Sequence, residues 1–251
     1  MIENIFKDEI IADKFNRYND VLEQVLGYNL VISMLRSYQS KTILDYGCGP
    51  GKVSLQLAEK LSASVFAIDE SAKMIDIARK ERPHECVNYT KVENDNLDFI
   101  QDNSLDSAIA CYVFINNSSE KRICNIMNQI YCKLKPNGRF IILDTNPNNT
   151  GVSFSTFQNG ISGKKYHYGE HRVEKLNIGS NEHLILNDFH WPTKMYERNL
   201  TQSGFKQVEV LYPKLNDFTS EEIKQIEKQY KYYDWSNEKI KAPFILYQAK
   251  K

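Results

Sequence analysis

The sequence has no excess of charge of either sign, because its 32 lysines and arginines equal its 32 aspartates and glutamates. A groove for extended nucleic acid or an anionic membrane surface usually requires a positive excess, so both are disfavoured as main partners. The sequence also lacks an apolar run of membrane-spanning length, and the charged stretch MIENIFKDEIIADKF contains no signal-peptide apolar segment. We therefore expect a soluble, cytoplasmic protein.

CxxC pairs and a helical HExxH motif are also missing. The five cysteines are interpreted as free, mostly buried thiols in a reducing compartment. Four of the five histidines lie between residues 167 and 190, but their spacing to nearby glutamates is not that of a helical zinc site. We expect no metal ion.

Short apolar runs alternate with helical periodicities in a chain that is 41% hydrophobic and 25% charged. This pattern predicts strands at 42–46, 64–69, 87–92, 105–114 and 139–145, and helices at 52–61, 72–82 and 120–134. Ser71 is the expected N-cap of the second of these helices. A turn is expected at 135–138. The alternation indicates parallel βαβ units in a doubly wound α/β sheet.

The segments on either side of this sheet are expected to cover it. Residues 3–39 have helical periodicity that Gly27 is expected to divide into two helices. After a polar stretch at 146–163 we expect an antiparallel hairpin (171–178 and 182–191, joined by 179–181), a helix (193–204), a strand (205–212), a helix (219–232) and a last strand (243–249). The chain is interpreted as a single domain, 1–251. Its parts are a helical cover (1–40), a cofactor-binding half (41–146), a substrate-cover insertion (147–190) and a C-terminal part (191–251).

The stretch TILDYGCGPGKVS places three glycines between a predicted strand and a predicted helix. Such a turn brings backbone N–H groups and the positive end of the helix close to a ligand. A Walker loop is excluded because Tyr46 and Val53 occupy positions that require glycine and Ser or Thr. A dinucleotide loop is excluded because Lys52 occupies the position of its third glycine. The remaining pattern, an acid followed by GxGxG, suits a ligand without a pyrophosphate; its residues are Asp45, Gly47, Gly49 and Gly51.

This loop resembles motif I of the class I S-adenosylmethionine-dependent methyltransferases. AIDESAKMIDIARK is similar to the second motif of that family, and IYCKLKPNGRFIILDTNP to its fifth strand; the resemblance covers roughly residues 40–146. It implies that Asp69 binds both ribose hydroxyls and that Met74 packs on the adenine, as a carboxylate and a thioether can. It also implies a seven-stranded sheet with an antiparallel last strand, helices on both faces, and a covering hairpin.

VENDNLDF is similar to the GDAxxLPF segment of the family, although Val92, Asn94 and Asp98 depart from that pattern. The resemblance implies that Glu93 accepts from the adenine amino group and that the backbone of Asn94 donates to the ring. S-adenosylmethionine is the implied methyl donor and S-adenosylhomocysteine the implied product. The remaining implied cofactor contacts are Tyr18, Glu70, Cys111 and Tyr112.

The acceptor site is expected over the carboxyl ends of the strands, where aromatic residues of the covers would suit a planar small molecule. A sulfonium is a ready methyl donor, so alignment can supply much of the catalysis and no single base is obligatory. His190 and His167 are the candidate bases if the acceptor must lose a proton.

We therefore expect methylation of an oxygen or nitrogen of a small aromatic or heterocyclic metabolite. Two alternatives stay open: methylation of a tRNA base or protein side chain, and a cofactor-binding relative without turnover. The sequence does not predict the oligomeric state.

Overall fold

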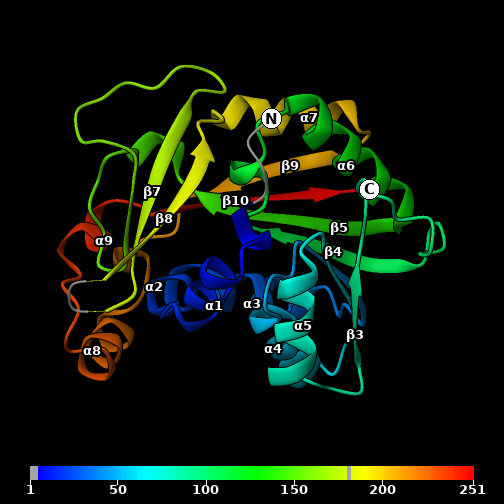
Figure 1. Cartoon of the computed structure of the whole chain (residues 1–251), viewed down its shortest axis with the longest axis horizontal. Helices are drawn as coiled ribbons and strands as arrows, with labels where there is room; N and C mark the ends of the chain where they lie inside the picture. The colour runs from blue at the N-terminus through cyan, green and yellow to red at the C-terminus, as the bar shows by residue number, and fades with distance from the viewer. Residues whose placement is uncertain (1–4, 180–181) are drawn as a thin grey trace.

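The computed structural model of this protein describes residues 5–179 and 182–251 and is built on one seven-stranded sheet (Figure 1). Its strands are β1 (Thr42–Tyr46), β2 (Ser64–Asp69), β3 (Val87–Lys91), β4 (Leu105–Cys111), β5 (Leu134–Thr145), β9 (Lys206–Leu211) and β10 (Phe244–Lys250). The strand order is β3-β2-β1-β4-β5-β10-β9. The pairs among β1 to β5 are parallel, whereas β10 is antiparallel to both of its neighbours. The predicted doubly wound sheet with an antiparallel last strand is confirmed.

The α-helices are α1 (Glu9–Arg17), α2 (Val21–Glu23), α3 (Asn29–Ser37), α4 (Lys52–Leu61), α5 (Ala72–Glu81), α6 (Glu120–Lys133), α7 (Thr193–Gln202), α8 (Ser220–Gln229) and α9 (Ser236–Ile240). Short 3-10 helices are η1 (Ile5–Lys7), η3 (Phe114–Asn116), η4 (Pro147–Asn149) and η5 (Leu215–Asp217), and η2 (Gln24–Tyr28) is a π-helical turn. Within the described chain, no helix has the length and apolarity needed to cross a bilayer.

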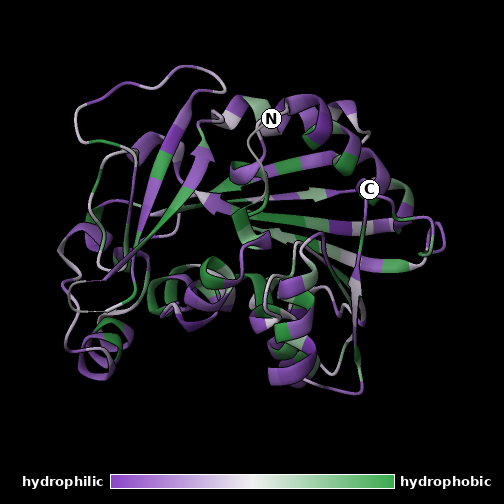
Figure 2. Ribbon diagram, in the orientation of Figure 1, coloured by the Kyte–Doolittle hydropathy of each residue, from purple (hydrophilic) through white to green (hydrophobic). Residues whose placement is uncertain are grey.

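Two helical layers enclose the sheet. In Figure 1, α3, α4 and α5 lie on one face of the sheet, and α6 and α7 lie on the other. Alternate strand residues supply the two cores: Ile43 and Val65 pack on the side of α3 and α4, whereas Leu44 and Ile68 pack on the side of α6. The hydrophobic colouring of Figure 2 is accordingly concentrated along the central strands. Each of these fully buried aliphatic side chains contributes about 1.5–3 kcal/mol to folding.

Local signals placed most of these elements correctly. The Ser71 side chain accepts a hydrogen bond from the backbone of Met74, so the predicted N-cap of α5 is confirmed. The predicted break at Gly27 is wrong, because Gly27 lies inside η2 and the break lies at residues 18–20, between α1 and α2. A Cβ on Gly27 would lie 2.8 Å from a methyl of Leu143, so its missing side chain permits close packing. The predicted turn at 135–138 is part of β5, which has a register irregularity there.

A second, three-stranded sheet lies beyond the carboxyl ends of β4 and β5 (Figure 1). It consists of β6 (Phe157–Asn159), β7 (His171–Asn177) and β8 (His183–Phe189), paired antiparallel in that order. The predicted hairpin is confirmed; Ser180 and Asn181 of its predicted turn lie outside the described residues. The short strand β6 and the helix α9 were not predicted from the sequence.

Candidate active site

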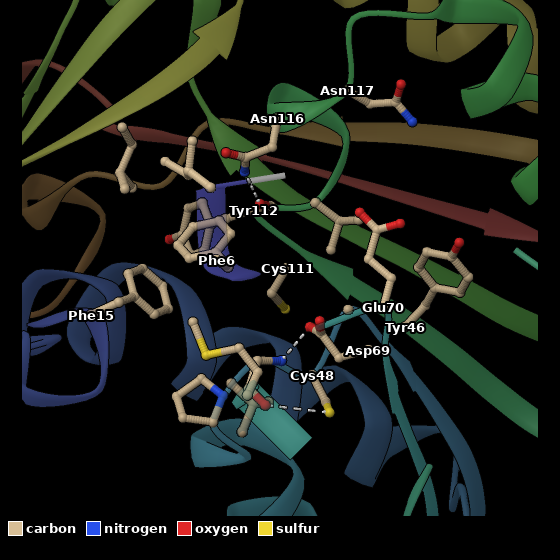
Figure 3. Close-up of a pocket in the computed structure, with 18 of the residues that line it drawn as sticks. Phe6, Phe15, Tyr46, Cys48, Asp69, Glu70, Cys111, Tyr112, Asn116 and Asn117 are labelled. Atoms are coloured by element: carbon tan, nitrogen blue, oxygen red, sulfur yellow. Dashed lines mark hydrogen bonds between the residues drawn. The ribbon is translucent and has the colours of Figure 1, made fainter. Parts of the chain in front are cut away.

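A cavity of about 460 Å³ opens at the carboxyl ends of β1, β2 and β4 (Figure 3). Its floor is the glycine loop between β1 and α4. One side is covered by the segment from η1 to η2, and the other by the inner face of the β7–β8 hairpin. The cavity therefore has a half near the glycine loop and a half between the N-terminal helices and the hairpin.

Glycine occupies the three positions of this loop for different structural reasons. All three have left-handed backbones, with φ of +73° at Gly47, +52° at Gly49 and +84° at Gly51. A Cβ on Gly51 would lie 2.7 Å from the Tyr89 hydroxyl, and one on Gly47 would lie 2.5 Å from a methyl of Val113. A Cβ on Gly49 would meet nothing closer than the Phe15 ring at 3.9 Å, so Gly49 leaves open space beside the cavity.

Two carboxyl groups lie beside this loop, the buried Asp45 and the half-buried Asp69. Asp45, at 2% exposure, accepts a 2.5 Å hydrogen bond from the Ser54 hydroxyl, and burial raises its pKa to about 7. Asp69 accepts hydrogen bonds from the backbone N–H of Gly49 (2.9 Å) and Ser71 (2.7 Å), and burial raises its pKa to about 6. Each oxygen of Asp69 receives one of these bonds and keeps a lone pair, so the carboxyl can accept further hydrogen bonds from a ligand.

A charged cluster closes the edge of the cavity beside β2. The Arg122 guanidinium donates to Glu70 at 2.7 Å and to both oxygens of Asp95 at 2.6 and 2.8 Å. The Tyr46 hydroxyl donates to the same Asp95 at 2.8 Å. These pairs fix the loops that follow β2 and β3 against α6. Glu70, one of the predicted cofactor contacts, lines the cavity, and its carboxyl is held by Arg122.

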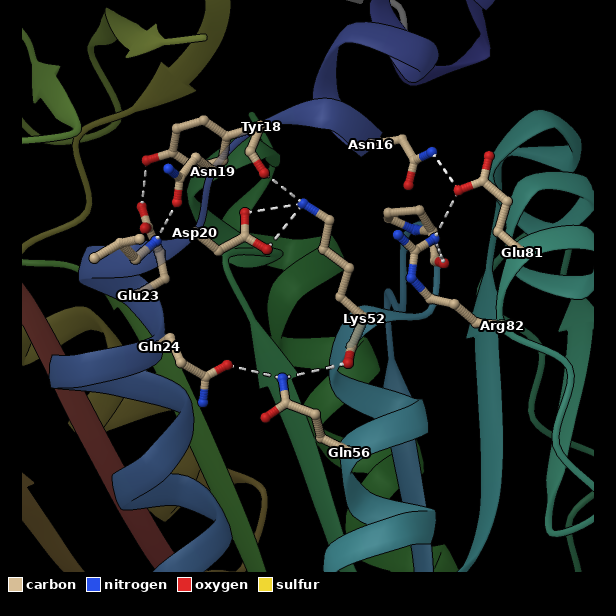
Figure 4. Close-up of polar contacts among 12 residues, drawn as sticks. Asn16, Tyr18, Asn19, Asp20, Glu23, Gln24, Lys52, Gln56, Glu81 and Arg82 are labelled. Carbon is tan, nitrogen blue, oxygen red and sulfur yellow. Dashed lines mark hydrogen bonds and ion pairs between the residues drawn. The ribbon is translucent and has the colours of Figure 1, made fainter. Parts of the chain in front are cut away.

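The N-terminal segment is fastened over the cavity by a polar clasp, which we define as Lys52, Asp20 and the Tyr18 carbonyl (Figure 4). The Lys52 ammonium contacts Asp20 at 2.9 Å and donates to that carbonyl at 2.8 Å. Beside this clasp, Phe6 and Phe15 pack edge to face at 5.0 Å and contact the small core that contains Met74. The segment thus brings an aromatic pair to the wall of the half near the glycine loop, beside the thioether of Met74 from α5.

The other half of the cavity has tyrosines around a buried acid. The Tyr18 hydroxyl donates to Glu23 Oε1 at 2.7 Å. The Tyr28 and Tyr112 rings pack edge to face at 6.2 Å. Tyr112 has a left-handed backbone, with φ of +58°, and its buried hydroxyl has no hydrogen-bond partner among the described residues. Bulky residues held in this strained conformation cluster at functional sites, so Tyr112 is a candidate functional residue of the cavity wall.

The hairpin supplies a second acid to this half. Glu174 is 6% exposed and lines the cavity with Leu176 and Leu186. Burial raises the pKa of Glu174, and the neighbouring Asp188 raises it further, while Asn159 and Arg172 lower it. The Asn159 amide donates to Glu174 over 3.3 Å and to Asp188 over 2.5 Å.

Most of the residues predicted as cofactor contacts meet in this one cavity. Those that line it are Tyr18, Asp45, Gly47, Gly49, Asp69, Glu70, Met74, Cys111 and Tyr112. The predicted cofactor contacts outside the lining are Gly51, Glu93 and Asn94. Glu93 is exposed and pairs with Lys91 at 2.8 Å, and Asn94 is exposed as well. The adenine contacts predicted for these two residues stay predictions.

Neither candidate base among the histidines lines the cavity. His167 is exposed, and its backbone N–H donates to Glu170. His190 is half-buried next to Tyr166, and burial lowers its pKa to about 4. The catalytic roles of both residues therefore stay predictions without support from this geometry.

Sequence reasoning missed several lining residues, above all Glu23 and Glu174. In β7 and β8 the charged Arg172, Glu174 and Asp188 point inward, whereas Val173 and Ile185 are exposed at 40% and 50%. Apolar residues normally mark the inner face of a hairpin, so the pattern favours the wrong face. The segment HRVEKL places Arg172, Glu174 and Leu176 at alternate positions. Two charged residues in register with a buried leucine are the signal that could have revealed the site.

Comparisons with known proteins agree with this geometry. The methyltransferase domain family matches residues 43–138. The chain is 32% identical over 182 residues to N-demethylindolmycin N-methyltransferase of Streptomyces griseus, covering 72% of this chain and 76% of that protein. It is 26% identical over 161 residues to the chloroplastic 2-phytyl-1,4-beta-naphthoquinone methyltransferase of Arabidopsis thaliana, covering 60% of this chain and 59% of that protein.

A solved S-adenosylmethionine-dependent methyltransferase from Mesorhizobium loti superposes with a TM-score of 0.57 at 20% identity, covering 87% of this chain and 96% of that chain. At this identity the likeness concerns the fold. The relative at 32% identity, with the matching domain family, establishes that the chain belongs to the S-adenosylmethionine-dependent methyltransferases. The protein is therefore an enzyme whose methyl donor is S-adenosylmethionine, and the open space at Gly49 beside the carboxyl of Asp69 fits that molecule.

Proposed function

We propose that the half of the cavity near the glycine loop binds S-adenosylmethionine. Asp69 accepts the two ribose hydroxyls with the lone pairs that its backbone bonds leave free. Met74, with Phe6 and Phe15 beside it, packs on the adenine. Asp45 and the open space at Gly49 receive the methionine end. S-adenosylmethionine supplies, when bound, a sulfonium methyl that is ready for transfer.

We further propose that the other half binds the methyl acceptor, a small aromatic or heterocyclic metabolite methylated at nitrogen or oxygen. The observation that carries this proposal is the continuity of one cavity from the glycine loop to the tyrosines Tyr18, Tyr28 and Tyr112. Aromatic walls with a few polar groups are typical of sites for planar small molecules. The names of the two sequence relatives specify an N-methylation and a naphthoquinone substrate, which supports a ring-containing acceptor.

Catalysis on this proposal comes mainly from alignment. The N-terminal segment and the hairpin hold the acceptor on the line of the transferring methyl and exclude water from it. Positioning of this kind can supply about 7–11 kcal/mol of a barrier. The clasp at Lys52 contributes by fixing the cover, and no step requires His167 or His190.

Methylation of a tRNA base or a protein side chain is the alternative. The formal net charge of zero gives no positive excess for binding a phosphate backbone, and the cover by α1 and the hairpin favours an acceptor small enough to be enclosed.

The test is transfer from S-adenosylmethionine that carries a labelled methyl group into a cell extract separated into small-molecule, tRNA and protein fractions. We expect label in the small-molecule fraction, and Asp69→Ala should reduce it strongly. The matched control is Asp76→Ala, which removes an exposed carboxyl of α5. Label confined to the tRNA or protein fraction would contradict the proposed acceptor class.

A further inference from the structure

The acceptor half of the cavity contains more carboxyl groups than it has cations to neutralise them. Glu23 and Glu174 both line it and are 5% and 6% exposed. They come from opposite covers, the helix α2 and the strand β7, and they are close enough that the charge of Glu23 raises the pKa of Glu174. An acceptor between the two covers therefore meets a carboxyl group on each side.

The cationic side chains of the described lining are engaged elsewhere. Lys52 pairs with Asp20, and Arg122 pairs with Glu70 and Asp95. Lys7 is exposed at the rim. On the same inner face of the hairpin as Glu174, Arg172 donates to the hydroxyls of Thr145 (2.9 Å) and Thr150 (3.0 Å), and it forms no ion pair within the described part of the chain. The acceptor half therefore has a net acidic wall.

Glu23 also has an unused binding group. Its Oε1 accepts from the Tyr18 hydroxyl, but the buried Oε2 has no hydrogen-bond partner in the described chain. A buried acceptor atom without a partner costs about 1–3 kcal/mol, so it marks a position that a donor from outside the chain would fill.

The backbone directs this group toward the cavity. Directly after Glu23 the helix widens into the π-helical turn η2, in which the N–H of Asn29 donates to the carbonyl of Gln24. The wider turn brings Glu23 and Tyr28, five residues apart, to the same wall. Single π-helical turns of this kind are frequent at functional sites.

From this arrangement we propose that the methyl acceptor is an amine, whose N–H groups are bound by the carboxyl groups of Glu23 and Glu174 while its ring lies against Tyr28 and Tyr112. The inference rests on the proposed acceptor site and narrows its substrate class from nitrogen or oxygen to a basic nitrogen. A protonated amine carries N–H donors and a positive charge. That charge lowers the raised pKa values of the two carboxyl groups, so that they release their protons to solvent when the amine binds and pair with it as carboxylates. When its proton passes from nitrogen to a carboxylate oxygen, an N–H bond breaks, an O–H bond forms and the nitrogen lone pair becomes free.

The experiment compares two probes with the same ring and chain, tryptamine and tryptophol. Tryptamine carries an ammonium group at the position where tryptophol carries a hydroxyl group. Binding of each is measured by calorimetry to protein saturated with S-adenosylhomocysteine. We expect tryptamine to bind about tenfold or more tightly than tryptophol, and Glu23→Gln and Glu174→Gln each to remove this preference. The matched control Glu59→Gln, which removes an exposed carboxyl of α4, should keep the preference.

Affinity for S-adenosylhomocysteine separates this inference from the proposed function. It should be unchanged in both glutamine variants, which also shows that they are folded. Equal or tighter binding of tryptophol, no binding of tryptamine at millimolar concentration, or an undiminished preference in both variants would overturn the amine assignment. Failure of the unaltered protein to bind S-adenosylhomocysteine would instead overturn the proposed donor site.

Discussion

Replacing Glu23 with glutamine removes a titratable group from the cavity while keeping the shape of the side chain. Burial, together with the charge of Asp20, raises the pKa of Glu23 from 4.5 to about 8, although the Tyr18 hydroxyl and Lys52 act in the opposite direction. The folded chain therefore holds this proton more tightly than the unfolded chain does. The stability that comes from the protonated group is fully present below the unfolded pKa and is lost as the pH rises through the folded value.

The size of the effect follows from that shift. A change of one pKa unit corresponds to 1.36 kcal/mol, so the shift of Glu23 from 4.5 to about 8 amounts to roughly 5 kcal/mol as an upper value. At about pH 5 the neutral carboxyl and the amide are equivalent, and the variant should match the unaltered protein. At about pH 9 the ligand-free Glu23→Gln protein should be more stable by a few kcal/mol, because no charge is buried.

The assay is urea unfolding of the ligand-free protein at a series of pH values, with the free energy of unfolding extrapolated to water. The difference in the free energy of unfolding between Glu23→Gln and the unaltered chain should widen steadily between pH 5 and 9 and should reach a few kcal/mol. The exposed control Glu59→Gln should follow the unaltered protein throughout. A constant difference for Glu23→Gln across this range would refute the assignment of a buried, protonated acid.

Gly51→Ala should lower the free energy of unfolding by more than the ~1–2 kcal/mol cost of a left-handed alanine, because its Cβ would also collide with Tyr89; thermal unfolding measures this. Gly49→Ala should cost only the backbone strain but weaken cofactor binding in calorimetry, since its Cβ enters the open space of the cavity; unchanged affinity would contradict this placement. Lys52→Met should leave the sheet intact but loosen the clasp by about 1–3 kcal/mol, seen as faster limited proteolysis before residue 20; equal cleavage rates would show that the clasp does not fasten the cover.

The alternating sheet and its cofactor loop were readable from the sequence because their signals are local. Strand, turn and helix follow one another at 42–61. Ser71 caps the next helix because its side chain accepts a hydrogen bond from the backbone N–H of Met74, three residues later. Asp69 and Met74 fall near the glycine loop because adjacent parallel strands end at the same edge of a sheet.

The acceptor half was not readable, because it depends on contacts between segments distant in sequence. Nothing local shows that Glu23 and Glu174 approach one another from α2 and β7. The exposed Val173 points away from the core, against the usual pattern of a hairpin. Gly27 was misread for a related reason: it packs closely on Leu143, which lies 116 positions later, and does not end its helix.

Calorimetric titration with S-adenosylmethionine tests the central claim most directly. We predict that the unaltered protein binds it with micromolar-to-millimolar affinity and that Asp69→Ala weakens the binding by about 1–3 kcal/mol, while the control Asp76→Ala leaves it unchanged. Absence of binding by the unaltered protein, or equal affinity in Asp69→Ala, would contradict the placement of the donor beside the glycine loop.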